Sequence, residues 1–159
     1  MRTRMELHIY LEMIVDLIID RLPSDLKMTI ELRHCNIADR EYKEDKRWLA
    51  HVGCYLYTIC YAKALLFQPY AIQRGILAHE VGHLLQYQGK AISRYGYSGF
   101  SGEIGADSLI KKYTGIDIIY KNGIQHADFD NKEALFEKCN EYLSSKEYWR
   151  KREKEYWRK

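Results

Sequence analysis

Residues 79 to 83 read HEVGH, inside the run AIQRGILAHEVGHLLQYQG. Apolar residues recur there at helical intervals, and a proline and a glycine punctuate the two ends, so we predict a helix over 70–88. Positions i and i+4 of a helix lie one above the other, so His79 and His83 can converge on a single ion. Two histidines at this spacing, with a glutamate after the first, are typical of a zinc site on one helix face.

A catalytic zinc site needs three protein ligands and one open position. The extended motif of the metzincins would require glycine at position 86 and histidine at position 89, where this chain has Gln86 and Gly89. The next candidates are Glu103 and Asp107 in SGEIGAD, and Glu103 lies twenty positions after His83. Both acidic residues fall on one face of a helix that we predict from EIGADSLIKKYT.

Together the two motifs resemble the signature of the gluzincin metallopeptidases, the thermolysin-like and CAAX-prenyl-protease-like superfamily. In that family HExxH is followed by a second helix that carries ExxxD, frequently ExxAD, and this chain has Glu103-Ile-Gly-Ala-Asp107. The resemblance covers roughly residues 26 to 125 and is specific at the two motif helices. It implies an α+β, zincin-like fold.

The resemblance also implies a role for each motif residue. His79, His83 and Glu103 would be the zinc ligands, with the fourth position open for water. Glu80 would be the general base, because it lies beside the metal and can take a proton from the attacking water. Asp107 would accept the second ring N–H of His79 and fix that imidazole. The implied activity is zinc-dependent hydrolysis of a peptide or protein substrate, by an endopeptidase since no terminus-binding feature is visible.

This chemistry also needs a donor for the developing oxyanion, in addition to the metal. His126, in QHADFD, is a catalytic candidate because it follows both motif helices. Tyr95 and Tyr97, in the loop before Glu103, are alternatives that the sequence leaves open. Gly82 lies inside the first motif and costs its helix about 1 kcal/mol relative to alanine. We therefore expect another element, the Glu103 helix, to approach it closely.

The other patterns predict the elements of one domain over residues 1–130, which the resemblance implies to be zincin-like. MELHIYLEMIVDLIIDRL is an amphipathic helix, and LKMTIELRHC alternates as a strand. WLAHVGCYLYTICYAKALLF contains one or two strands joined near Gly53, and its HVGCYLYTICY part is a candidate sheet edge for strand addition by an extended peptide. We expect a small twisted sheet of about three strands. NIADREYKEDKR is interpreted as a solvated loop and IDIIYKNGIQHADFD as a turn.

A basic, aromatic helical arm is predicted over residues 131–159. Its large side chains recur every seven residues, at Leu135, Tyr142, Trp149 and Tyr156. This spacing is typical of packing on the same domain or on a partner helix. Residues 146 to 159 hold seven Lys/Arg against three Glu, so the basic charge is concentrated there. Three roles stay open: a packing arm, a homodimer contact, or a cover that keeps a protease latent.

Composition indicates where the protein is located and which partners it binds. No apolar stretch approaches the roughly 18 residues of a membrane span, so we expect a cytoplasmic protein without one. The four cysteines form no CxxC pair, which favours reduced thiols. Nucleic acid is disfavoured as a partner, because the charge is mixed and no binding module is recognised. Two rivals to the protease remain: a catalytically silent gluzincin scaffold that binds or regulates, and an accessory protein that binds nucleic acid through its tail.

Overall fold

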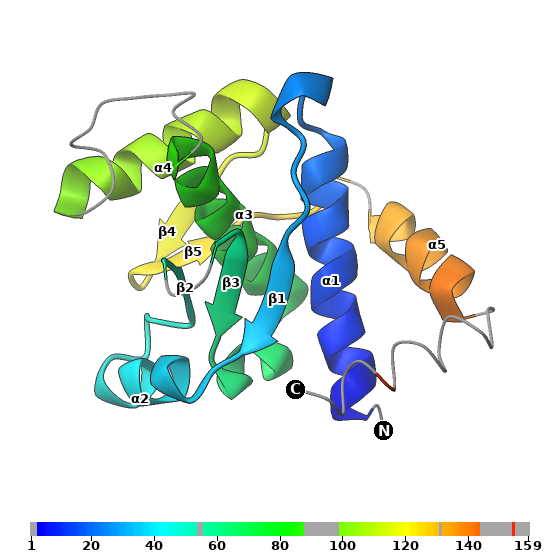
Figure 1. Cartoon of the computed structure of the whole chain (residues 1–159), viewed down its shortest axis with the longest axis horizontal. Helices are drawn as coiled ribbons and strands as arrows, with labels where there is room; N and C mark the ends of the chain where they lie inside the picture. Colours follow the sequence, from blue (N-terminus) through cyan, green and yellow to red (C-terminus); the bar gives the residue numbers. More distant parts are fainter. Residues whose placement is uncertain (1–2, 54–55, 88–98, 131, 144–153, 155–159) are drawn as a thin grey trace.

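A buried helix forms the centre of the fold. The computed structural model is an α+β structure, as predicted. It describes residues 3–53, 56–87, 99–130, 132–143 and 154. The helix that carries HEVGH, α3 (Tyr70–Tyr87), contacts α1 (Arg4–Asp20), α4 (Gly99–Thr114) and strands of two small sheets, as Figure 1 shows. Every residue of α3 from Gln73 to Gln86 is buried, so its polar side chains need partners inside the protein.

A three-stranded sheet lies beside α3 (Figure 1). Its central strand, β3 (Thr58–Tyr61), is buried throughout and pairs parallel with β1 (Glu31–His34) and antiparallel with β2 (Ala50–Val52). The predicted sheet of about three strands is therefore confirmed, and the segment expected to hold one or two strands joined near Gly53 forms two, which run antiparallel. In the strand order β1-β3-β2, β2 is an edge strand, and it contacts α3.

Two connecting segments differ from the prediction. The expected solvated loop forms α2 (Asn36–Glu44), a polar helix in which only Ala38 is buried. The expected turn contains a second sheet, the hairpin of β4 (Ile119–Lys121) and β5 (Ile124–His126). Asn122 and Gly123 connect its strands, and both have positive φ angles, 54° and 76°. An Asn-Gly pair at positive φ is the favoured two-residue hairpin turn, so this signal was present in the sequence.

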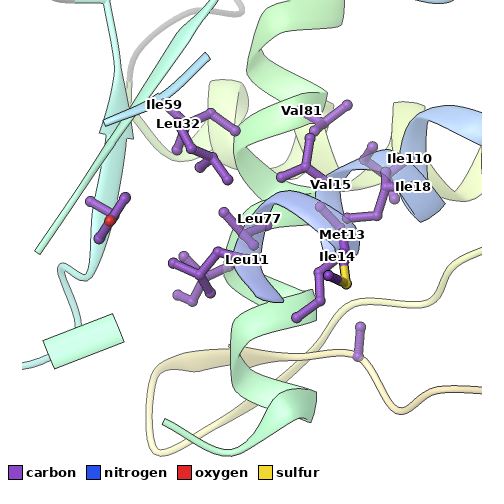
Figure 2. Packing of buried hydrophobic residues seen from close by; sticks show 14 of the residues in the cluster. Leu11, Met13, Ile14, Val15, Ile18, Leu32, Ile59, Leu77, Val81 and Ile110 are labelled. Atoms are coloured by element: carbon purple, nitrogen blue, oxygen red, sulfur yellow. The ribbon is translucent and has the colours of Figure 1, made fainter. Parts of the chain in front are cut away.

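The main hydrophobic core lies between α1, α3 and the three-stranded sheet. Figure 2 shows Leu11 and Val15 of α1 with Leu77 and Val81 of α3. The burial of α1 is wider than one amphipathic stripe and includes Tyr10. The reason is that α5 (Lys132–Leu143) covers the side of α1 that faces away from α3 (Figure 1). None of the described helices combines the length and apolar character that crossing a membrane requires.

Short 3-10 helices complete the described elements. Segment η1 (Ser24–Leu26) follows α1, and η2 (Lys63–Phe67) leads from β3 toward α3. The amide of Gln73 donates to the carbonyl oxygens of Leu65 and Leu66, which ties η2 to the first turns of α3. Of the predicted arm, the part after Leu143 falls outside the described residues, apart from position 154.

Two glycines of α3 allow neighbouring backbones to come close. A Cβ atom at Gly82 would overlap the backbone of Ala106 in α4, so the expected close approach to the Glu103 helix is observed. A Cβ atom at Gly75 would lie 2.6 Å from the backbone carbon of Gln125 in β5. These contacts bring α4 and the β4–β5 hairpin against the turns of α3 that carry HEVGH.

Candidate metal centre

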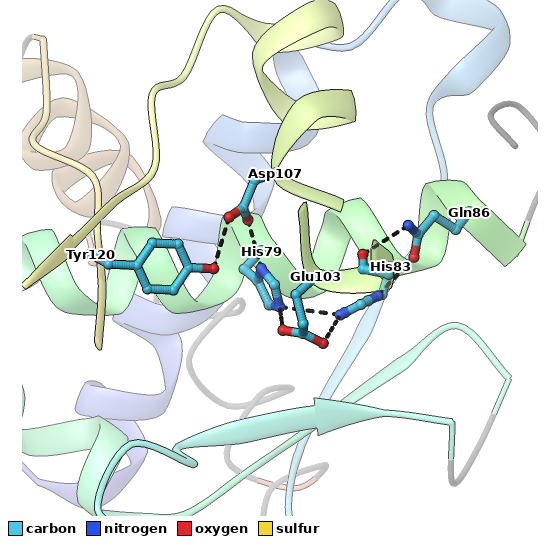
Figure 3. A network of polar contacts seen from close by, with 7 residues as sticks. His79, His83, Gln86, Glu103, Asp107 and Tyr120 are labelled. Atoms are coloured by element: carbon cyan, nitrogen blue, oxygen red, sulfur yellow. Dashed lines mark hydrogen bonds and ion pairs between the residues drawn. The ribbon is translucent and has the colours of Figure 1, made fainter. Parts of the chain in front are cut away.

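The three predicted ligands lie together between α3 and α4. The Nε2 atoms of His79 and His83 are 3.1 Å apart. The carboxylate of Glu103 bridges them, with Oε2 at 2.6 Å from His79 Nε2 and Oε1 at 3.1 Å from His83 Nε2 (Figure 3). Both imidazoles are buried, whereas Glu103 reaches in from the rim with 46% of its side chain exposed. These residues form a group that could hold a metal ion.

The other ring nitrogen of each histidine has its own partner (Figure 3). His79 Nδ1 donates to Asp107 Oδ1 at 2.6 Å, and His83 Nδ1 donates to Gln86 Oε1 at 2.8 Å. The direction is fixed because a carboxylate can only accept, and because Gln86 Nε2 donates to the carbonyl oxygen of Gly102 at 3.0 Å. In their neutral forms, both rings therefore carry the proton on Nδ1 and present a bare Nε2 lone pair to Glu103.

This arrangement attracts positive charge. Burial opposes protonation of His79, but hydrogen bonds to Asp107 and Glu103 outweigh it and raise the pKa of His79 to about 10. Burial likewise opposes protonation of His83, yet its contact with Glu103 leaves the His83 pKa raised. Hydrogen bonds from the same two imidazoles hold the pKa of the Glu103 carboxyl far below its usual range. Two lone pairs and a carboxylate that converge on one point are the donor set that binds a divalent cation.

Glu80 lies in the same cavity without belonging to the ligand group. It is only 6% exposed. Burial raises its pKa to about 7, against the opposing effect of the two nearby imidazoles. A carboxylate whose pKa lies near neutral pH is well suited to accept and return a proton.

A cavity of about 310 Å³ opens in front of these side chains. The edge strand β2 lines it together with His79, Glu80 and His83. At the middle of β2, the Nδ1 atom of His51 lies 2.7 Å from Oε1 of Glu41 in α2, and both residues line the cavity. His51 was not predicted from the sequence, because its place beside the site depends on the register of β2 with β3.

Of the predicted oxyanion donors, His126 is the one that lies within the described residues, and it does not line this cavity. His126 ends β5, where its Nδ1 donates to the carbonyl oxygen of Ile124 at 2.9 Å. The neighbouring residue Gln125 lines the cavity, whereas His126 is not among the lining residues. Successive side chains of a strand point to opposite faces, which accounts for the difference. Tyr95 and Tyr97 lie outside the described residues.

Two supporting residues were not selected from the sequence. Gln86 lies three positions after His83, a spacing that puts both on one helix face, so this signal was available. Its amide fits because position 105 is glycine: a Cβ atom there would lie 2.7 Å from Gln86 Nε2. Tyr120 of β4 donates its hydroxyl to Asp107 Oδ2 at 2.8 Å and extends the chain of contacts behind His79 (Figure 3). The sequence does not reveal this contact, because it depends on the position of the β4–β5 hairpin relative to α4.

Comparisons of the chain with protein-family models, curated proteins and solved structures find no match. Its function is therefore inferred from the chemistry of its own residues.

Metal binding to this group should release protons. An imidazole binds metal in its neutral form, and the raised pKa of His79 means that the metal-free site carries a proton at pH 7. We expect metal affinity to rise with pH below about 10, by about tenfold per pH unit for each proton released. Calorimetric titrations in buffers of different ionisation enthalpy count the protons. If the heat of metal binding did not depend on the buffer and the metal affinity did not depend on pH, the site would release no proton and the expectation would be wrong.

Proposed function

We propose that this protein is a zinc-dependent peptidase of the gluzincin type, with His79, His83 and Glu103 as the ligands. The observation that carries the proposal is a buried glutamate, Glu80, beside a converging group of two imidazoles and one carboxylate. A purely structural metal site has no need of a general base, and such sites are normally closed by a fourth protein ligand. Here the ligand group borders a cavity.

The donor set fits zinc. Ligands that are about 2.0 to 2.1 Å from a tetrahedral zinc ion lie about 3.3 Å from one another. The separations of His83 Nε2 from His79 Nε2 and from Glu103 Oε1 are both 3.1 Å. The remaining distance, 2.6 Å from His79 Nε2 to the other carboxylate oxygen of Glu103, Oε2, is the length of a charge-assisted hydrogen bond. Zinc bound there would polarise the scissile carbonyl and lower the pKa of a water molecule to about 7.

Glu80 is the proposed general base. Its carboxylate accepts a proton from the water that attacks the scissile carbonyl and passes it to the leaving amine, so the residue ends the cycle in its starting form. Asp107 and Gln86 act indirectly, because each holds a ligand imidazole by Nδ1 and leaves Nε2 directed at the metal position.

His51 is the oxyanion donor that we favour over His126. It lines the cavity that contains Glu80, and Glu41 fixes the orientation of its ring. An N–H of His51 would be the donor to the negative charge that develops on the carbonyl oxygen. The backbone of β2, an edge strand that lines the same cavity, is a suitable partner for an extended peptide substrate.

Replacing Glu80, the proposed general base, distinguishes zinc binding from catalysis. We expect Glu80→Gln to keep one zinc per chain and to lower cleavage of an unfolded protein substrate by about 10² to 10⁴-fold, because the shape is kept and the proton acceptor is lost. Zinc content by mass spectrometry and product formation by chromatography measure the two effects. Equal cleavage by both proteins would rule out Glu80 as the base. Zinc binding without any cleavage by the wild type would instead favour the silent scaffold.

Replacing His51, the proposed oxyanion donor, should lower kcat. We expect His51→Asn to lower kcat by about 10² to 10³-fold with a smaller effect on KM. His34 supplies a matched control, because its Nε2 lies 2.7 Å from Asp39 Oδ2 and its side chain is 22% exposed, as is that of His51, but it does not line the cavity. His34→Asn should leave kcat unchanged. A loss of turnover in His126→Asn but not in His51→Asn would reverse the assignment.

A further inference from the structure

Tyr120 connects the β4–β5 hairpin to the metal site. Its hydroxyl donates to Oδ2 of Asp107 at 2.8 Å. The other oxygen of this carboxylate, Oδ1, accepts the Nδ1 proton of His79 at 2.6 Å, as Figure 3 shows. The carboxylate thus receives one hydrogen bond from the hairpin and one from a proposed zinc ligand. A single side chain, that of Asp107, separates Tyr120 from the ligand imidazole.

The register of the hairpin directs Tyr120 to this position. Tyr120 pairs with Gln125, and the side chains of paired residues lie on the same face of a sheet. Gln125 lines the cavity that contains the ligand group, so this face of the hairpin is directed at the site. The next pair, Ile119 and His126, alternates to the opposite face. A shift of the register by one residue would turn the Tyr120 side chain away from Asp107.

Burial alone holds β4 weakly. All three of its residues are exposed, so little apolar surface is removed from water there. The partner strand β5 is half-buried and lies against α3, and just after it the amide of Ala127 donates to the carbonyl oxygen of Ala71 at 2.9 Å. Elements that bury little apolar surface open locally at a low free-energy cost. The hydrogen bond from Tyr120 to Asp107 is therefore important for holding the outer strand on α4.

Loss of the Tyr120 hydroxyl would release the Asp107 carboxylate on one side. The Asp107 side chain is 19% exposed, so water can take the place of the phenol. Water also donates a hydrogen bond, so the charge on the carboxylate would change little. Its orientation would change more, because the phenol is carried by the hairpin whereas water has no covalent anchor. Tyr120 therefore acts on the site through the position of Asp107, and with it through the orientation of the His79 ring.

The hydrogen-bond partner of a ligand imidazole strongly affects metal affinity. Removing such a partner typically costs about 10- to 100-fold in affinity. Tyr120 lies one side chain further out, so its effect should fall at the lower end of this range. Coupling between two binding events is reciprocal. If a docked hairpin tightens metal binding, bound metal stabilises the docked hairpin by the same factor.

We propose that Tyr120 is a positioning residue for the metal site, and that metal binding and docking of the β4–β5 hairpin stabilise each other through Asp107. This inference rests on the ligand set of the proposed function, and it adds a means of regulating that site. A hairpin that leaves α4 lowers the affinity for zinc. Gln125 belongs to the same hairpin and lines the cavity, so docking also completes the cavity wall beside the ligands.

Tyr120→Phe tests the hydrogen bond, because it removes the hydroxyl and keeps the ring. We expect its zinc affinity at pH 7 to be about tenfold below that of the wild type, measured by competition with a chromophoric chelator. Tyr113 is a matched control: it lies in α4 as Asp107 does, but it contacts Lys112 and does not line the cavity. Tyr113→Phe should leave the affinity unchanged. Equal zinc affinity of Tyr120→Phe and the wild type would overturn the proposal.

A double variant tests the route through Asp107. Asp107→Ala removes the acceptor of the Tyr120 hydroxyl, so adding Tyr120→Phe to it should cause no further loss of zinc affinity. A second loss of about tenfold in the double variant would show that Tyr120 does not act through Asp107. That result would also overturn the proposal.

Hydrogen exchange at the amides of β4 and β5 tests the reciprocal effect, which a merely structural role of Tyr120 would not produce. Zinc should slow this exchange in the wild type by up to about tenfold, and much less in Tyr120→Phe. The amides of α5, which lies on the far side of α1, are the internal control and should respond to zinc equally in both proteins (Figure 1). Hairpin exchange that zinc leaves unchanged in the wild type would contradict the coupling.

Neither measurement depends on turnover, so this inference and the proposed function can fail separately. A wild type that bound zinc and cleaved no peptide would remove the peptidase function, while a weaker zinc affinity of Tyr120→Phe would still support the coupling. An active peptidase whose zinc affinity and hairpin exchange did not respond to Tyr120→Phe would keep its function and overturn the coupling. A wild type that bound no zinc would overturn both.

Discussion

Three electron-rich groups, the Nε2 atoms of His79 and His83 and the carboxylate of Glu103, point into one small volume of this protein. The Nδ1 proton of each imidazole is committed to another acceptor, so neutral rings would leave two lone pairs facing each other at 3.1 Å. Only a positive charge makes this arrangement favourable. The raised pKa of His79 reflects the same demand, with a proton in the place that a metal ion would take.

The rest of the fold supports this convergence. Burial of α3 removes its imidazoles from water, and Gly82 lets the backbone of α4 approach close enough for Glu103 to reach both rings. Asp107, backed by Tyr120, holds one ring, and Gln86, which fits against Gly105, holds the other. A buried cluster of ionisable groups costs free energy when its charges are unbalanced. A ligand that binds only the folded state would offset that cost and couple metal binding to stability.

Local patterns predicted the metal group better than its surroundings. HEVGH and Glu103-Ile-Gly-Ala-Asp107 are short-range spacings on helices, and helix geometry turns such spacings directly into shared faces. The α2 helix was missed because it is short and mostly charged, and Ala38 is its only buried residue. His51 and Tyr120 reach the cleft through strand register and the position of a hairpin, and a single sequence encodes neither as a local pattern. The Asn122-Gly123 turn was a usable signal, but the exposed, three-residue strand β4 lacks the alternation that marks a strand.

X-ray absorption at the zinc edge of the zinc-loaded chain would reveal whether His79, His83 and Glu103 together bind zinc. We expect one zinc per chain with only nitrogen and oxygen neighbours, at about 2.0 to 2.2 Å, and scattering from two imidazole rings. In Glu103→Ala the zinc should be lost or its oxygen shell altered. Sulfur neighbours at about 2.3 Å, or a spectrum that Glu103→Ala leaves unchanged, would mean that these three residues do not bind zinc together.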